Sequence, residues 1–269
     1  MEIIGFIASL IIGVSLGLIG GGGSILTVPV LVYLFKVEPV LATAYSLFIV
    51  GLTSLAGVVP KYNHGEVNFK TALLFGIPSM LSVFINRAYI VPAIPNEVFS
   101  LYTFVITKGM LMMLLFAVLM IVASVSMINS KSKKSEEKRS EQSFSYPMII
   151  LGGTGEGLLT GLVGAGGGFL IIPALVLLCK LPMKQAIGTS LLIIAAKSLI
   201  GFTGDLGKQE MDWTLLLTVS GLAMVGIFIG SAMSKRISPD SLKIGFGYFI
   251  LVMGIYILIK EIILPVLGH

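Results

Sequence analysis

Two glycine-rich segments carry the residues of this 269-residue chain that are best suited to ligand chemistry. The first runs from Gly17 to Pro29, and the second repeats it from Gly161 to Pro173, at an offset of 144 residues. Because glycine has no Cβ, a ligand can approach its backbone closely, and amides that begin a helix attract anions. We therefore expect both segments to bind an anion through backbone N–H groups and the Ser24 hydroxyl. The predicted donors are the backbone amides of Gly22, Gly23, Ser24, Gly166, Gly167 and Gly168.

Close packing of helices is the alternative explanation for these glycines. Gly13 and Gly17 have the small-xxx-small spacing that lets membrane helices touch, and packing is the favoured interpretation for such upstream positions. The runs 20–23 and 164–168 differ, because packing does not require adjacent glycines and adjacency weakens a helix. Neither run is a phosphate loop, since no Gly-Lys-Ser/Thr follows it. These two runs are therefore interpreted as functional breaks.

Charged residues inside apolar segments form a second group of candidates. A charge near the bilayer centre needs a partner or a water-filled cavity. We predict that Lys197 faces the transport pathway and attracts the anion. Glu156 either pairs with Lys197 or carries a proton that couples transport, and a purely structural Glu–Lys pair is the alternative. Lys108 lies about two turns into the run 101–128, and Arg87 ends another run. Snorkelling to the interface is the simpler expectation for both, and guidance of anions at the mouth is the alternative for Arg87.

The composition is that of an integral membrane protein. Apolar residues make up 56% of the chain and charged residues only 12%, against about 25% in soluble domains. The net charge of +5 is spread between apolar runs, which does not suggest nucleic acid as a partner. One Cys and two His exclude a disulfide framework and argue against a metal site, and no cofactor is predicted.

The apolar runs must position the glycine-rich segments within the bilayer. As one helix, residues 3–35 would measure about 50 Å against a hydrocarbon core of about 30 Å, so the chain must break near residues 20–23. The runs 24–35 and 168–180 are too short to cross unaided, and whether they cross or re-enter stays open. The predicted runs are 3–19, 24–35, 39–59, 70–90, 101–128, 147–163, 168–180, 185–203, 213–234 and 241–264.

The placement of Lys and Arg separates two topologies. Five membrane elements in each half give inverted repeats and place 12 Lys or Arg on one side against 4 on the other, whereas four elements in each half give 9 against 7. Because positive residues favour the cytoplasmic side, we expect the inverted arrangement. The prediction is an all-α polytopic protein with a first repeat at 1–128, a cytoplasmic linker at 129–146, a second repeat at 147–269 and both termini outside.

The paired pattern Gly-Leu-x-Gly-x-Gly-Gly, ending in Pro in both halves and followed by Gly188-Thr-Ser-Leu-Leu192, resembles the TauE/SafE sulfite-exporter family of anion transporters. The resemblance covers essentially the whole chain and implies transport of sulfite, sulfoacetate or other sulfonate-like anions. It also implies Thr189 and Ser190 as hydroxyl donors to the substrate. The first half departs from this pattern, with Ala44-Tyr45-Ser46 at the matching positions, so the two halves are expected to line the path unequally.

The sequence thus predicts a secondary transporter of small anions in the inner cell membrane. Its site is expected between the two glycine-rich breaks, with alternating access through rocking of one repeat against the other. An anion channel with the same donors and a continuous pore is the alternative. An enzyme is the least favoured hypothesis, because no nucleophile–base pair is evident. The expected partners are a small anion and the lipid bilayer, and a homodimer is compatible with the sequence.

Overall fold

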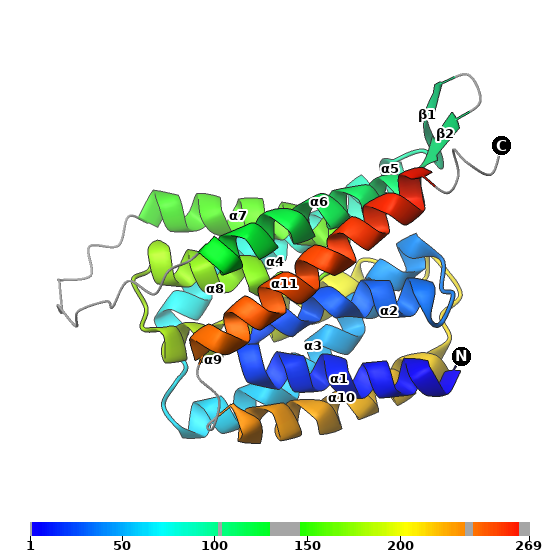
Figure 1. Ribbon diagram of the computed structural model, residues 1–269. Coiled ribbons are helices and arrows are strands. Elements are labelled where there is room, and N and C mark those ends of the chain that lie inside the picture. Colours follow the sequence, from blue (N-terminus) through cyan, green and yellow to red (C-terminus); the bar gives the residue numbers. More distant parts are fainter. Residues whose placement is uncertain (1, 102–103, 130–145, 235–238, 264–269) are drawn as a thin grey trace.

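The computed structural model describes residues 2–101, 104–129, 146–234 and 239–263 as a bundle of long helices (Figure 1). The elements of the first half are α1 (Glu2–Ile19), η1 (Gly21–Leu26), α2 (Thr27–Tyr33), α3 (Pro39–Asn63), α4 (Phe69–Ile85), η2 (Asn86–Ile90), α5 (Val91–Ala93), β1 (Glu97–Leu101), β2 (Phe104–Thr107) and α6 (Lys108–Asn129). Those of the second half are α7 (Tyr146–Val163), α8 (Gly168–Leu177), α9 (Met183–Thr203), α10 (Trp213–Met233), α11 (Pro239–Leu258) and η3 (Ile259–Ile263). The all-α polytopic prediction is confirmed.

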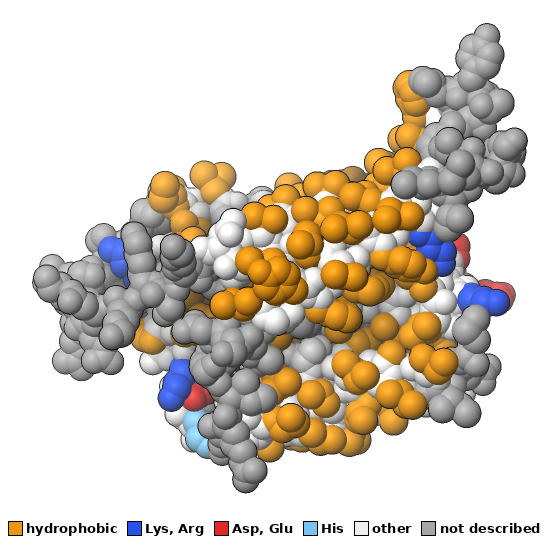
Figure 2. All heavy atoms as spheres, viewed as in Figure 1, with side chains coloured by type: hydrophobic (Ala, Val, Ile, Leu, Met, Phe, Trp, Pro, Cys, Tyr) orange, Lys and Arg blue, Asp and Glu red, His pale blue; other side chains and the backbone are white. Residues whose placement is uncertain are grey.

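Helix length and surface both match a lipid environment. Within the described residues, five segments are long and apolar enough to cross a membrane: α3, the continuous stretch Phe69–Ala93, α6, α9 and α10. Large apolar side chains such as Leu151, Leu177 and Val252 are exposed on the outside of the bundle. Figure 2 shows hydrophobic side chains spread over the long helices, while charged ones gather at the two ends. This distribution is typical of a multi-pass membrane protein.

Short polar side chains fix where several helices begin. The Glu38 carboxylate accepts a hydrogen bond from the Leu41 amide at 3.0 Å, Asn68 caps α4, and Asp212 caps α10 in the same way. Such caps satisfy amides that have no partner inside the helix. The sequence between the apolar runs therefore sets the helix boundaries, including the start of α3 beside the pocket described below.

One predicted run begins differently from the expectation. The apolar run 101–128 was expected to be helical throughout, but Glu97–Leu101 and Phe104–Thr107 pair as the antiparallel strands β1 and β2, and α6 starts only at Lys108. The segment Phe104–Thr107 contains Val, Ile and Thr, whose branched side chains favour strands. As a consequence Lys108 lies at the beginning of α6 and not two turns inside it.

The helix contacts of the first half recur in the second. α1 packs on α10, and α7, the counterpart of α1, packs on α4, the counterpart of α10. The pair α3–α9 joins counterparts, as does the pair of last long helices, α6–α11, and η1 packs on α8, whose first residues correspond to the end of η1. In Figure 1, α6 runs away from the hairpin end of the molecule, whereas α11 runs back toward it. The two halves therefore pack around each other through equivalent surfaces.

The duplication extends to single backbone angles. Lys36 and Lys180, which are 144 residues apart, are the two non-glycine residues with positive φ in the described chain, at 56° and 50°. Gly20 and Gly164, at the same offset, also have positive φ, at 76° and 71°. A left-handed lysine is uncommon, so its recurrence at matched positions marks the same turn after each short helix. The linker predicted at 129–146 lies outside the described residues except for its two ends.

Candidate functional site

The two glycine-rich breaks meet inside the bundle. A Cβ placed on Gly168 would overlap the backbone of Gly21, and one on Gly21 would overlap Gly168. Gly21, Gly23 and Ser24 in η1 are buried, as are Gly166, Gly167 and Gly168 at the start of α8. Gly22 lies in the same turn, η1. Only glycine, which has no side chain, therefore fits at these two positions where the halves touch.

Each break also touches the long helix of the other half at equivalent positions. A Cβ on Gly20 would meet Ile187 of α9, and a Cβ on Gly164 would meet Thr43 of α3, which is 144 residues before Ile187. The α9 face that contains Ile187 continues through Ser190, Ile194 and Lys197, because these residues are spaced by three or four. The face of α9 that carries Lys197 therefore adjoins the first break.

The second break opens the N-terminus of α8. Gly164, Gly166 and Gly167 all have positive φ, and Gly167 is the N-cap of α8 with φ of 70°. The amides of Leu170 and Ile171 both donate to the Gly167 carbonyl oxygen at 2.9 Å. Within the described chain the amides of Gly168 and Phe169 donate to no acceptor. The start of α8 therefore combines free backbone donors with the positive end of a helix dipole.

A buried ion pair lies directly beside this helix start. Lys197 of α9 is fully buried and donates to the carboxylate of Glu156 on α7, and also to Thr160 Oγ1 at 3.1 Å. Ser79 of α4 donates to the second oxygen of Glu156 at 2.7 Å. A Cβ on Gly167 would collide with Glu156, Thr160 and Lys197 together. Lys197 and Glu156 are therefore paired, and their charged groups lie against Gly167 of the second break.

The two predicted hydroxyls occupy different surroundings on α9. Thr189 Oγ1 accepts a hydrogen bond from the Asn68 amide at 2.9 Å, which ties α9 to the start of α4. Ser190 lies on the face shared with Ile187 and donates to the Ile187 carbonyl oxygen at 2.8 Å. At about 1.5 Å per residue, Ser190 and Lys197 are about 10 Å apart along the helix. Thr189, one residue further away, therefore does not lie beside Lys197 either.

Arg87 does not snorkel to the membrane surface. Its side chain is fully buried, and Nε donates to Asp205 Oδ2 at 2.6 Å in an ion pair. Nη1 donates to Thr43 Oγ1 at 2.9 Å. The sequence signal for this pairing was an Arg at the end of one apolar run and an Asp just after another, but their 118-residue separation left the contact unspecified. Arg87 is thus the main charged residue that sequence reasoning misplaced.

The fold and the central ion pair define a class of membrane protein. Two equivalent halves, each with a helix broken by glycines, meet at buried backbone and at charged side chains inside the bundle. Discontinuous helices of this kind, in corresponding positions of two halves, are typical of transporters.

Comparison with known proteins gives the family. The sequence profile described as "Sulfite exporter TauE/SafE" matches residues 5–257, so the chain belongs to this family. A probable membrane transporter protein of Xylella fastidiosa is 27% identical over 92% of this chain and 91% of its own length. The probable membrane transporter protein YunE of Bacillus subtilis is 27% identical, over 95% of this chain and 97% of its own.

The similarity extends to archaea. The probable membrane transporter protein MJ0441 of Methanocaldococcus jannaschii is 25% identical over 94% of both chains. No solved structure matches the chain. The protein is therefore a multi-pass membrane transporter of the TauE/SafE family, and the resemblance noted from the glycine-rich motifs is confirmed.

Proposed function

We propose that the protein is a secondary transporter of small anions, with its central site where the two glycine-rich breaks meet. One observation carries this proposal: the ammonium group of Lys197 lies against Gly167, the residue that directly precedes the unpaired amides of Gly168 and Phe169. Backbone N–H groups at a helix start and a buried cation both favour a negative ligand. Sulfite, sulfoacetate and other sulfonate-like anions are the substrates proposed from the family.

The proposed transport cycle follows from the closeness of the contact. The backbones of Gly21 and Gly168 touch, so an anion reaches the amides only after the two breaks separate. Inverted repeats that rock against each other provide such separation, and the recurring contacts α1–α10 and α7–α4 are surfaces on which they would move. Gly22, Gly23, Ser24, Gly166, Gly167 and Gly168 are the proposed backbone donors, with Thr189 and Ser190 as proposed hydroxyl donors.

Glu156 is the proposed coupling residue. In this structure its carboxylate holds the ammonium group of Lys197, so the pair carries no net charge. A proton on Glu156 would release Lys197 to the anion, and loss of that proton would return Lys197 to its partner. Proton and anion would then move together.

The proposed orientation follows from the distribution of Lys and Arg. The transporter would lie in the inner cell membrane, with the end of α6 and the start of α7 on the cytoplasmic side.

Transport by reconstituted protein tests the function. Purified protein in proteoliposomes is given radiolabelled sulfite, sulfoacetate or acetate, with and without a pH gradient. We expect saturable uptake of the sulfur anions that is stimulated by unlabelled anion on the opposite side. Conductance that rises in proportion to voltage, without such stimulation, would instead support the channel alternative. Protein-free liposomes and Lys197→Met protein are the controls.

A further inference from the structure

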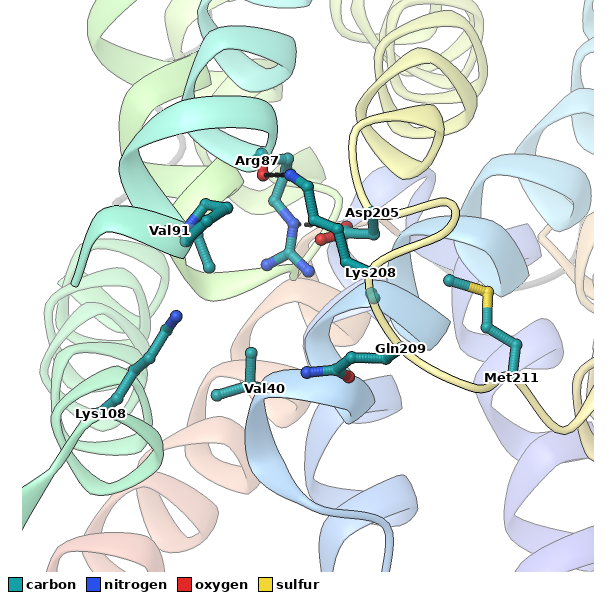
Figure 3. A pocket seen from close by; sticks show the side chains of 10 residues that line it. Val40, Arg87, Val91, Lys108, Asp205, Lys208, Gln209 and Met211 are labelled. Atoms are coloured by element: carbon teal, nitrogen blue, oxygen red, sulfur yellow. Dashed lines mark hydrogen bonds and ion pairs between the residues drawn. The ribbon is translucent and has the colours of Figure 1, made fainter. Parts of the chain in front are cut away.

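A pocket of about 280 Å³ lies at the end of the bundle where α9 ends and α6 begins. Its wall comes from the start of α3, from η2 and α5, from Lys108 and from the loop 204–212. Figure 3 shows the terminal nitrogens of Arg87 pointing into the space between Val40, Lys108 and Gln209. The central ion pair and the glycines that touch each other do not line this pocket. It is therefore separate from the central site.

The charge of the pocket wall is positive. Arg87, Lys108 and Lys208 line it together with one carboxylate, Asp205. Glu38 stands nearby at the start of α3, where its carboxylate caps the Leu41 amide. Opposite charge near a concave surface raises the local concentration of a mobile ion. The electrostatics of this wall therefore favour an anion.

Two cationic groups in the pocket have unused donors. Arg87 is fully buried, and its Nη2 has no hydrogen-bond partner although Nε and Nη1 are both engaged. Lys108 Nζ makes no hydrogen bond or ion pair with any described residue, and Figure 3 shows it pointing toward Arg87. Buried polar groups are nearly always paired, so an unpaired guanidinium nitrogen indicates a missing acceptor.

Lys208 has a different role, because two of its three N–H donors are already used. Its Nζ donates to the carbonyl oxygens of Arg87 and Ala88 at 2.8 and 2.9 Å. These bonds hold the loop 204–212 against η2 and fix the backbone that carries Arg87. Burial lowers the pKa of Lys208, and Arg87 adds to this effect, while Asp205 opposes it. Lys208 therefore mainly fixes the pocket wall and adds positive charge to it.

Arg87 connects the pocket to the second glycine-rich break. Thr43 accepts a hydrogen bond from Arg87 Nη1, and Thr43 is also the residue that Gly164 touches. Arg87 Nη1 further contacts the Gly161 carbonyl oxygen at 3.4 Å. A change in the position of Arg87 would therefore be felt directly at the turn that precedes α8.

We propose that this pocket is a second anion site, a vestibule in which Arg87 Nη2 and Lys108 Nζ bind a small oxyanion or sulfonate before it reaches the central site. The carboxylate of Asp205 competes with a bound anion for Arg87, since it already occupies one edge of the guanidinium group. Sulfonate and sulfate groups present several acceptor oxygens, which suit a planar guanidinium and an ammonium group. The role in transport rests on the proposed function, whereas binding in the vestibule does not.

Equilibrium binding of sulfate to detergent-solubilised protein tests the vestibule without requiring transport. Isothermal titration calorimetry would be made on the wild type, Asp205→Asn and Lys108→Gln. Removal of the competing carboxylate should tighten sulfate binding at least about fivefold, and removal of the Lys108 charge should weaken it about three- to tenfold. Lys184→Gln is the matched control, because Lys184 is an exposed residue at the opposite end of α9. It should bind sulfate like the wild type.

A second set of variants separates the two proposals and guards against unfolding. Arg87→Gln combined with Asp205→Asn removes both charges of the pair without leaving one unpaired, and it should abolish sulfate binding in protein that still melts cooperatively. Gly167→Ala should impair transport while sulfate binding in the vestibule persists. Sulfate binding that is absent in the wild type, or unchanged in both Asp205→Asn and Lys108→Gln, would overturn the vestibule and leave the central site untouched.

Discussion

The two glycine-rich breaks share a backbone plan but differ in their surroundings. Around Gly23, a Cβ would meet Ser15 and Leu16 of α1, whereas around the equivalent Gly167 it would meet Glu156, Thr160 and Lys197. Thr160 occupies the position that corresponds to Leu16. One half therefore supplies an uncharged wall and the other a charged one. Both halves therefore have the glycine-rich break, whereas only the second half carries the charged pair.

The first prediction tests the second break directly. Gly167→Ala places a methyl group against the buried ion pair at a φ of 70°, where L residues are strained, and should lower transport at least about a hundredfold. Gly155→Ala on α7 is the matched control, because a Cβ there meets nothing within 4 Å. Uptake into proteoliposomes is the measurement. Equal uptake by both variants would remove backbone capture at Gly167 from the mechanism.

The second prediction concerns the charge that only one half carries. Lys197→Met leaves Glu156 buried without its cation and should lower transport about thirtyfold or more, from about 2 kcal/mol of lost interaction. Thr53→Ala changes the equivalent residue of α3 and should have a much smaller effect. Glu156→Gln combined with Lys197→Met should recover thermal stability without recovering transport. Wild-type transport in that double variant would make the pair purely structural.

The third prediction is a pH dependence at the vestibule. Burial raises the pKa of Asp205, although Arg87 and Lys208 act in the opposite direction. Because Asp205 then takes up a proton at a higher pH than an ordinary carboxyl, it releases Arg87 as the pH falls. Sulfate binding should therefore strengthen roughly fivefold from about pH 8 to pH 5. The charged groups that face Asp205 are Arg87, Lys108, Lys208 and Glu38. If Asp205 is the group that titrates, Asp205→Asn should make sulfate binding independent of pH over this range.

The fourth and smallest effect is expected at Thr189. Its hydroxyl accepts the Asn68 amide, so Thr189→Val should destabilise the protein by about 1 kcal/mol and lower its melting temperature. Because the O–H of Thr189 is still able to donate to the substrate, KM should also rise by more than about threefold, whereas a smaller change would make the bond to Asn68 its main role. Ser190→Ala is the comparison, since Ser190 bonds within its own helix on the face that contacts the first break. A large rise in KM for Thr189→Val would make this hydroxyl a substrate ligand.

Hydropathy and glycine spacing predicted most of the fold, because membrane helices must be long, apolar and internally hydrogen-bonded. The breaks at residues 20–23 and 164–168 could be located because helices of that length do not fit a bilayer. The hairpin of β1 and β2 could not be located in this way. Val105 and Ile106 are as apolar as the residues of a membrane helix, so hydropathy does not distinguish a strand from a helix there. A period-two pattern over so few residues is too short to decide.

The candidate site was predictable in its types of residue but not in its pairings. Glu156 and Lys197 stood out because charges are rare inside apolar runs, and pairing was one of two hypotheses. Arg87 was expected at the membrane surface, because its sequence neighbours place it at the end of a run. Its burial depends on Asp205 and Thr43, which come from other helices. Such tertiary contacts leave no local pattern in a single sequence.

The meeting of Gly21 with Gly168 has a practical consequence. A methyl group on either residue could not be accommodated while the halves remain in contact, so Gly21→Ala would act as a wedge between them. A protein held apart in this way would be a means of trapping the separated conformation for structure determination. This contact between the halves is thus also a place where a single added methyl group would reveal how far they can separate.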